Sequence, residues 1–512
     1  MTPDRDANTP ATEDGSAITR RTLIKGGLMA AATGLALPTA SAASLFTPAA
    51  RSGGPLRSTA AGPVMTALAN YMKEAQTRAL PPDAAEHTKR HVLDTLAAMV
   101  SGAELPPGRT ALTYVHAYAG GATATVVRSK TLAGPIEAAL ANAMMAHADE
   151  TDDSHAPSQS HPGCSIVPAA LAAGERFGND GARFLRAVAL GYDIGTRVTM
   201  TLGATGFEVG SHQSSHAIAG IWGSAAAAGC AAGLSVQQLP WLLAYAADQS
   251  SGLTVWQRDT DHIQKAFAFA GVGARNGVAA ALMVESGWTG VDDVLSGQYN
   301  FLNAYAPKAD AAKLIDKLGE RYEITRTNIK KWSVGSPIQA PLDALATMRA
   351  KHPFEADQVR SVVVRVATSE GNLVDNREMP DISMQHMIAV MLVDKTASFK
   401  SAHDKPRMQD AAIVRQRAKV TLVRDEALER LLPSRVAIVE VTLEDGTTLT
   451  ERVDAVRGTA QNPMTREEVV AKARDLMAPV LGARSTASLI DKVVSMETVR
   501  DVRELRPLLQ GS

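Results

Sequence analysis

The densest group of side chains suited to acid–base chemistry lies between residues 147 and 161. His147, His155 and His161 occur there with four carboxylates, in a segment that is also rich in Ser and Pro. A carboxylate or an imidazole can move a proton when a neighbouring group orients it, so the segment predicts an acid–base site. The four carboxylates are Asp149, Glu150, Asp152 and Asp153.

Two other interpretations of this segment remain open. It can be a solvated polar loop, which is the usual structure of a run of charges. It can also hold a metal ion, because His and carboxylate groups are ligands for Zn, Mn and Fe. The spacing fits no established metal pattern such as H-E-x-x-H, and we therefore expect no metal site.

Further polar groups occur at three places downstream. His212 and His216 directly precede a helix rich in small residues, and backbone N–H groups at a helix start favour anions. Two further pairs of cations are Lys265 with Arg275 and Lys330 with Lys331, and solvated surface charges are an equally good interpretation of both pairs. If the lysines face the acid–base segment, the site suits an anionic substrate that carries carboxylates.

Composition and missing motifs exclude several other classes of function. The net charge of −1 gives no electrostatic footprint for nucleic acid or an anionic membrane. The sequence contains no G-x-G-x-x-G after a strand, no G-x-x-x-x-G-K-[ST] and no G-x-S-x-G. These absences argue against nucleotide-dependent chemistry and against an α/β-hydrolase.

Most of the chain has the apolar period of helices, which must position these groups. The helical period starts near Pro63 and returns after Pro463. Between them, β-branched runs predict strands, and Asp445-Gly446 predicts a hairpin turn. Predicted helices include 184–198, 218–234 and 467–476; predicted strands are 361–367, 418–423 and the hairpin 435–453.

This pattern predicts a mainly α fold. We expect a large helical domain formed by both chain ends, with a smaller α+β lid domain inserted into it. The expected boundaries are a signal peptide at 1–42, a linker at 43–62, helical domain at 63–325, lid at 326–460 and helical return at 461–512.

The first residues predict export. Arg20-Arg21 precede an apolar run at 26–37, and Ala40-Ser-Ala42 closes it like a signal-peptidase site. The pattern is typical of a twin-arginine signal cleaved near Ala42, which predicts a periplasmic protein. A membrane anchor would need about 20 apolar residues, so none is expected after cleavage.

Taken in order, these patches resemble the MmgE/PrpD family over about residues 62–505. That family includes 2-methylcitrate dehydratase, cis-aconitate decarboxylase and an iminodisuccinate epimerase. The resemblance implies a homodimer with its active site in the cleft between the two domains, without a metal or organic cofactor. The landmarks are 147–153 with His161-Pro162, 223–234, 265–277 with 287–290, 330–343 and 458–464.

The resemblance also implies roles for individual residues. His161 matches the family's loop histidine and is expected to be the principal acid–base group. Glu150 stands where the family has Asp, and Ser154 where it has Thr. The next family histidine falls on His216 or His212. The implied substrate-binding residues are Lys265, Lys330, His212, Asp153 and His155, together with Gln339 at a position that is usually His and His386 at one that is usually Tyr.

These expectations define a cofactor-independent lyase of the dehydratase type. It would act on a small di- or tricarboxylate by proton transfer next to a carboxylate, through an enolate-like intermediate. A decarboxylase or epimerase of the same family remains an alternative. So does an exported carboxylate-binding protein that has lost catalysis, because Gln339 and His386 depart from the family pattern.

Overall fold

The structure is a computed structural model that describes residues 60–510. The predicted signal peptide, at residues 1–42, lies outside the described residues. So does the predicted linker, apart from its last three residues.

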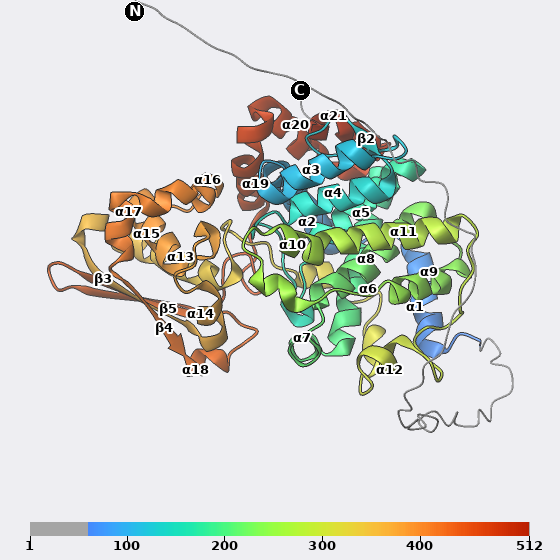
Figure 1. Ribbon diagram of the computed structural model, residues 1–512, viewed down its shortest axis with the longest axis horizontal. Helices are drawn as coiled ribbons and strands as arrows, with labels where there is room; N and C mark the ends of the chain where they lie inside the picture. Colours follow the sequence, from blue (N-terminus) through green and yellow to red (C-terminus); the bar gives the residue numbers. More distant parts are fainter. Residues whose placement is uncertain (1–59, 511–512) are drawn as a thin grey trace, which may run out of the picture. The chain divides into compact units, whose positions relative to one another are not determined.

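A first hydrophobic core joins side chains from residues 65–329 with side chains from residues 464–509. We call this the helical part. Both ends of the described chain build it, so the predicted mainly helical fold is confirmed (Figure 1). Its helices are α1 (Pro63–Ala75), α2 (Pro82–Gly102), α3 (Pro106–Tyr118), α4 (Pro135–Ala146), α5 (Gly163–Phe177), α6 (Gly181–Leu202), α7 (Thr205–Ser211), α8 (Ser215–Ala232), α9 (Gln238–Asp248), α10 (Ile263–Ala266), α11 (Val272–Glu285), α12 (Phe301–Tyr305), α19 (Arg466–Leu481), α20 (Ala483–Val494) and α21 (Arg506–Gln510), with short strands β1 (Ala124–Thr125) and β2 (Leu132–Ala133).

Helix α8 is buried from Ser215 to Ala231 and packs against α5, α6 and α11. Small residues make this approach close enough for backbones to touch. A Cβ on Gly195 of α6 would lie 2.3 Å from the backbone oxygen of Ala219 and 3.1 Å from the Cα of Gly223. The small-residue face predicted for residues 218–234 is therefore a packing surface in the core.

The segment Ile263–Glu285 is long and apolar enough to cross a membrane. It consists of α10, a π-helical turn at Phe267–Gly271, and α11. About 61% of its most apolar stretch is buried inside the protein, where it packs against α4 and α8. Its apolar side chains are thus largely buried in the core of the helical part.

A second hydrophobic core lies within residues 334–456, which we call the α+β part. Its four-stranded sheet has the order β4-β3-β5-β6, with β3 parallel to β4 and antiparallel to β5, and β5 antiparallel to β6. Helices α13 and α15 pack on the sheet (Figure 1). The elements are β3 (Val359–Ala367), β4 (Val420–Asp425), β5 (Ala437–Leu443), β6 (Thr448–Val453), α13 (Ser336–Lys351), α14 (Thr368–Val374), α15 (Met384–Asp394), α16 (Phe399–His403), α17 (Ala411–Arg417) and α18 (Glu426–Glu429).

The predicted strands and hairpin are confirmed. Alternate valines of β3 face the core, as the period of two requires. Between β5 and β6, Gly446 has φ +89°, which glycine adopts readily, and the Asp445 side chain accepts a 2.8 Å bond from the Thr447 N–H. The Asp-Gly turn thus fixes the register of the hairpin.

Candidate active site

The loop between α4 and α5, residues 147–162, carries most of the predicted acid–base groups. His147 and the four carboxylates of this loop are at most 6% exposed. The interpretation of the segment as a solvated polar loop is therefore wrong. Buried ionised groups persist only when they are paired, so the partners of each group determine its role.

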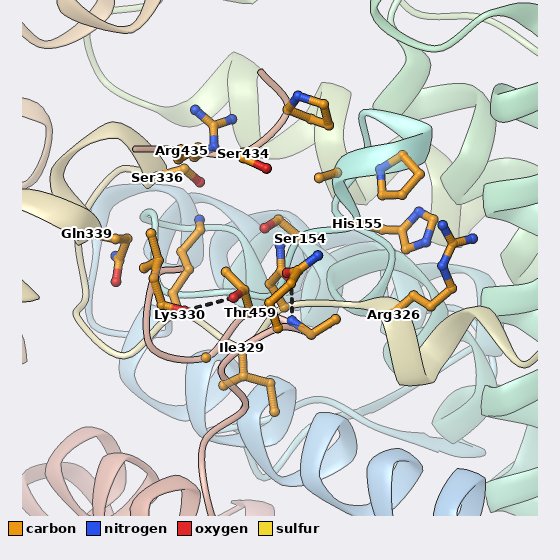
Figure 2. Close-up of a pocket in the computed structure, with 18 of the residues that line it drawn as sticks. Ser154, His155, Arg326, Ile329, Lys330, Ser336, Gln339, Ser434, Arg435 and Thr459 are labelled. Atoms are coloured by element: carbon orange, nitrogen blue, oxygen red, sulfur yellow. Dashed lines mark hydrogen bonds between the residues drawn. The ribbon is translucent and has the colours of Figure 1, made fainter. Parts of the chain in front are cut away.

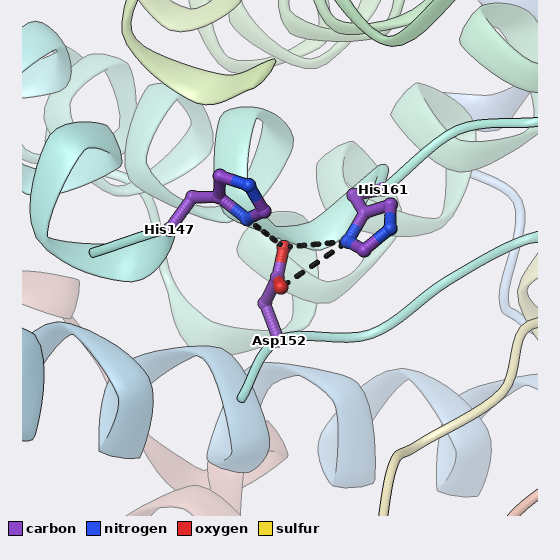
Figure 3. Close-up of side chains that lie close together, drawn as sticks. All are labelled: His147, Asp152 and His161. Carbon is purple, nitrogen blue, oxygen red and sulfur yellow. Dashed lines mark hydrogen bonds and ion pairs between the residues drawn. The ribbon is translucent and has the colours of Figure 1, made fainter. Parts of the chain in front are cut away.

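Asp152 lies between two histidines at the centre of the loop (Figure 3). Its carboxylate lies 2.9 Å from Nδ1 of His147 and 3.1 Å from Nδ1 of His161. Burial raises the pKa of Asp152, but His147, His161 and Lys330 together hold it well below its usual range. An ionised carboxylate only accepts hydrogen bonds, so each Nδ1 carries a proton, and Nε2 of a neutral His161 is left to accept one.

Asp153 closes the base of the loop. One of its oxygens accepts the Gly163 N–H at 2.9 Å; the other accepts the Tyr192 hydroxyl at 2.5 Å and lies 2.7 Å from Nδ1 of His91. A Cβ on Gly163 would lie 2.8 Å from this carboxylate, which explains the glycine at the start of α5. Both oxygens of Asp153 are occupied, so the structure places this residue in the support of the loop and not against a substrate.

Glu150 is held between the two predicted carboxylate-binding lysines. Lys265 of α10 forms an ion pair with it, and Nζ of Lys330 lies 3.6 Å from its other oxygen. Lys330 also donates a 2.8 Å bond to the Glu150 backbone oxygen. Burial raises the pKa of Glu150, but the two ammonium groups hold it well below its usual range. Glu150 is therefore an ionised group that orients the lysines.

The Phe269 ring lies against three histidines, His147, His161 and His216. The Phe269 ring stacks on His216, with centroids 3.8 Å apart, and on His147 at 4.5 Å. The ring centres of His161 and His216 are 5.2 Å apart. Burial lowers the pKa of His161 and lowers that of His216 well below its usual value. Both imidazoles are neutral at pH 7, the form in which each can accept a proton.

A cavity of about 200 Å³ lies beside these histidines, and both parts of the chain line it. Six of the sequence-predicted residues lie on its wall: Ser154, His155, His161, His216, Lys330 and Gln339. Figure 2 shows Lys330 and Gln339 in the wall close to the α+β part, with Ser154 nearer the middle. The structure thus contains a cavity that both parts line, and the location of the active site there stays a prediction.

Ser154 and His155 reach the cavity from a short stretch of paired backbone. Ser154 exchanges backbone bonds with Asn328, of 3.0 and 2.8 Å. The ring of His155 is fixed on both sides, with Nδ1 2.8 Å from the Ser158 hydroxyl and Nε2 3.4 Å from Glu323. The side chain of Ser154 is the freer of the two to bond a ligand.

Three other predicted residues do not offer free groups to the cavity. The Gln339 amide bonds the backbone of Trp332 and Val334, through its donors at 2.7 and 2.8 Å and its oxygen at 3.1 Å. His386 is fully buried in α15, within the α+β part, and is not among the residues that line the cavity. His212 is exposed at the end of α7. The histidine that joins the cluster is thus His216.

Three arginines on the cavity wall were missed by the sequence interpretation: Arg326, Arg435 and Arg457. Each forms an ion pair with a glutamate, respectively Glu323, Glu370 and Glu468. Figure 2 draws Arg326 and Arg435 on different sides of the pocket. Arg326 stands 109 residues before Arg435, and Arg457 a further 22 residues on, so the three form no motif and only the fold shows that they converge.

Two groups of side chains have the donor spacing of a metal site: His147 with Asp152 and His161, and His147 with Glu150 and His262. Both groups share their carboxylates with lysines. Nζ of Lys330 lies 3.6 Å from Asp152 and 3.6 Å from Glu150, and Lys265 contacts Glu150 as well. Positive charge is therefore already supplied by ammonium groups, and the residues present do not fit a divalent cation.

The chain was also compared with known proteins. Residues 66–313 match the family model of the MmgE/PrpD N-terminal domain, and residues 332–496 match that of the MmgE/PrpD C-terminal domain. A cis-aconitate decarboxylase-like protein of Aspergillus oryzae is 26% identical over 486 residues, which are 89% of this chain and 98% of that protein. The cis-aconitate decarboxylase of Aspergillus terreus is 24% identical over 87% of this chain and 96% of its own. That of Homo sapiens is 26% identical over 83% and 90%.

Proposed function

Because the chain belongs to the MmgE/PrpD family, we propose that it is a lyase that acts on a small di- or tricarboxylate by proton transfer next to a carboxylate. The observation that carries this proposal is the cavity of about 200 Å³ with neutral histidines on one side and cations around it. Such a wall suits an anion whose charge grows during the reaction. Lys330 on the cavity wall supplies positive charge without a cofactor, and we propose that none is needed.

His161 is the acid–base group of this proposal. Its Nε2 takes or gives the proton at the carbon next to the carboxylate, while Asp152 holds Nδ1 and stabilises the imidazolium that forms in passing. Lys330 and the wall arginines offset the charge that develops on the enolate oxygens. Ser154 and His216 donate hydrogen bonds to the substrate.

Decarboxylation is the first reaction to test, because the relatives reported above are named cis-aconitate decarboxylases. In that reaction the bond to a carboxylate carbon breaks, CO₂ leaves, and the electron pair left on carbon is protonated. Dehydration breaks a carbon–oxygen bond from the same enolate-like state. We also propose, from the family resemblance, that the chain forms a homodimer.

The test is proton exchange by the full chain in D₂O with a panel of small di- and tricarboxylates, followed by NMR. Deuterium next to a carboxylate with CO₂ release supports the decarboxylase; a new alkene without CO₂ supports the dehydratase. Exchange without a change of skeleton indicates an epimerase. No exchange with any compound would contradict the proposal and favour the binding protein.

His161→Gln should reduce the exchange rate by about 10²–10⁴-fold, because the proton-transfer group is removed. The control is His352→Gln, which changes an exposed histidine of the α+β part. Circular dichroism of both variants separates loss of catalysis from loss of fold. Equal rates in His161→Gln and the unchanged protein would exclude His161 as the acid–base group.

A further inference from the structure

Helix α16 of the α+β part lies against α19 of the helical part (Figure 1). The Phe399 N–H donates a 3.0 Å bond to the Asp475 carboxylate of α19, and the Phe399 ring packs against the core of the helical part. This short helix is therefore anchored on the opposite part at its first residue. Its last residue, His403, reaches the catalytic loop.

His403 forms an ion pair with Asp149. Its Nδ1 donates to the Phe399 backbone oxygen at 2.7 Å, which leaves Nε2 facing the Asp149 carboxylate at 2.9 Å. The two side chains are 15% and 4% exposed, so water screens the pair little. Burial alone would lower the pKa of His403, but Asp149 and then Asp381 raise it to about 9.

Asp149 transmits this contact to the neighbouring residue, Glu150. Its carboxylate also accepts the Thr151 N–H at 3.0 Å and the Thr151 hydroxyl at 2.6 Å. The Thr151 backbone oxygen in turn accepts a 2.9 Å bond from Lys472 of α19. Glu150 stands between the two residues of this turn, so a contact that fixes the turn also fixes Glu150 and the lysines paired with it.

From this geometry we propose that His403 is a positioning residue. Its ion pair with Asp149 couples the packing of the α+β part against the helical part to the conformation of the loop that carries Glu150. The effect of this pair on the turnover rate rests on the proposed function, because it needs a measurable reaction. The effect of this pair on the conformation of the loop does not rest on the proposed function.

The pair depends on pH in a direction that follows from its surroundings. Asp381, from the turn at Pro380–Ile382, is buried near His403, and burial raises the pKa of Asp381 to about 6. Beyond Asp381 lie Glu150 and Lys265, of opposite sign, and Lys400 and Asp404 flank His403 on its own segment. Since the folded-state pKa of His403 is raised, its stabilisation is complete below about pH 6.5 and is lost as the pH rises through about 9.

The experiment is hydrogen–deuterium exchange of the full chain, with peptides covering residues 147–153 analysed by mass spectrometry. His403→Gln keeps a donor but removes the charge, and Asp149→Asn removes the other half of the pair. At pH 7 each variant should exchange the loop amides at least about tenfold faster than the unchanged protein, since one pKa unit corresponds to a factor of ten. The ratio of variant to unchanged protein should fall towards one above pH 9, where the unchanged protein loses the pair as well.

The matched control is Lys395→Gln, which removes an exposed ion pair of the α+β part, between Lys395 and Glu355. It should leave the loop amides unchanged at every pH. If both pair variants exchange these amides at the unchanged rate, or if their ratio does not vary with pH, the proposal is wrong. If either His403→Gln or Asp149→Asn fails to fold, the exchange rates of the other variant test the proposal.

Turnover is then measured on the same proteins. With the proposed activity present, His403→Gln should lower kcat about tenfold with little change in KM, because the loop and not the substrate contact is altered. An effect on KM alone would contradict the positioning role. Absence of turnover in the unchanged protein would contradict the proposed function and leave the exchange result standing.

Discussion

Lys330 is 4% exposed and forms ion pairs with two buried carboxylates, so its charge stabilises the fold. Removing one partner from a buried ionic cluster leaves an uncompensated charge, which costs more than the pair contributes. The same ammonium group also lines the cavity. Binding and stability are therefore coupled at this residue.

Lys330→Met should lower the free energy of unfolding by about 3 kcal/mol, the cost of breaking a buried ion pair. The pKa values of Glu150 and Asp152 should move up towards their usual ranges. Because a depressed carboxyl pKa stabilises the fold above the unfolded-state value, acid unfolding should then begin at a higher pH. Denaturant titrations at several pH values measure both effects.

Lys331→Met is the matched control for this variant. Lys331 is 31% exposed and lies 3.7 Å from Asp343, so water screens this pair more than it screens the pairs of Lys330, and the loss of stability should be smaller. The KM for a substrate found in the exchange panel should rise in Lys330→Met and not in the control. Equal stability of the two variants would mean that the buried cluster is not charged as described.

Sequence reasoning at the residue scale found groups that are close in the chain and missed those that are close only in space. The run from His147 to His161 was visible because its residues are adjacent. His403 and His262 are single histidines without a pattern, and each reaches the loop through the fold. His386 was predicted to bind substrate from its family position alone. That position does not show that the residue is buried inside α15, away from the cavity.

At the scale of elements, the contact between α6 and α8 supports the loop at residues 147–162. Tyr192 of α6 bonds Asp153, and His216 stands near the start of α8. The two helices approach closely only because the residues between them lack side-chain volume. The distance between α6 and α8 therefore helps to set the positions of Tyr192 and His216.

Gly195→Ala tests this contact. The added Cβ would lie 2.3 Å from a backbone oxygen, and relief of such overpacking costs about 1–3 kcal/mol. Thermal unfolding should report this loss. Gly206→Ala in α7 meets no atom within 4 Å and should leave the stability nearly unchanged. A stable Gly195→Ala protein would mean that the helices can move apart freely.

The elements themselves were predictable where local preference and burial agree. The strands of the α+β part follow the period of two because one face meets the helices and the other does not. The helix at 218–234 was predicted from small apolar residues, and α8 is buried there up to Ala231. Sheet order was not predictable, since the parallel pairing of β3 with β4 depends on contacts across more than fifty residues.

At the scale of the whole molecule, the sequence predicts export by the twin-arginine route, and we keep this as a proposal. The change Arg20→Lys with Arg21→Lys should abolish the appearance of the protein in the periplasm, because the receptor reads both arginines. Fractionation followed by N-terminal sequencing is the measurement. Unchanged protein should start near Ala43, and Arg5→Lys is the control. Export of the double variant would exclude this route.

The bond between Lys472 and the backbone of Thr151 also sets an order of events during synthesis. Lys472 follows Thr151 by 321 residues, and its ammonium group is paired with Asp94 as well. A chain still attached to the ribosome has made the loop at residues 147–162 long before this lysine, which is one of the residues that hold the loop. This contact therefore forms only after α19 has been made, and a chain that ends before α19 would carry the chemical groups of the loop without it.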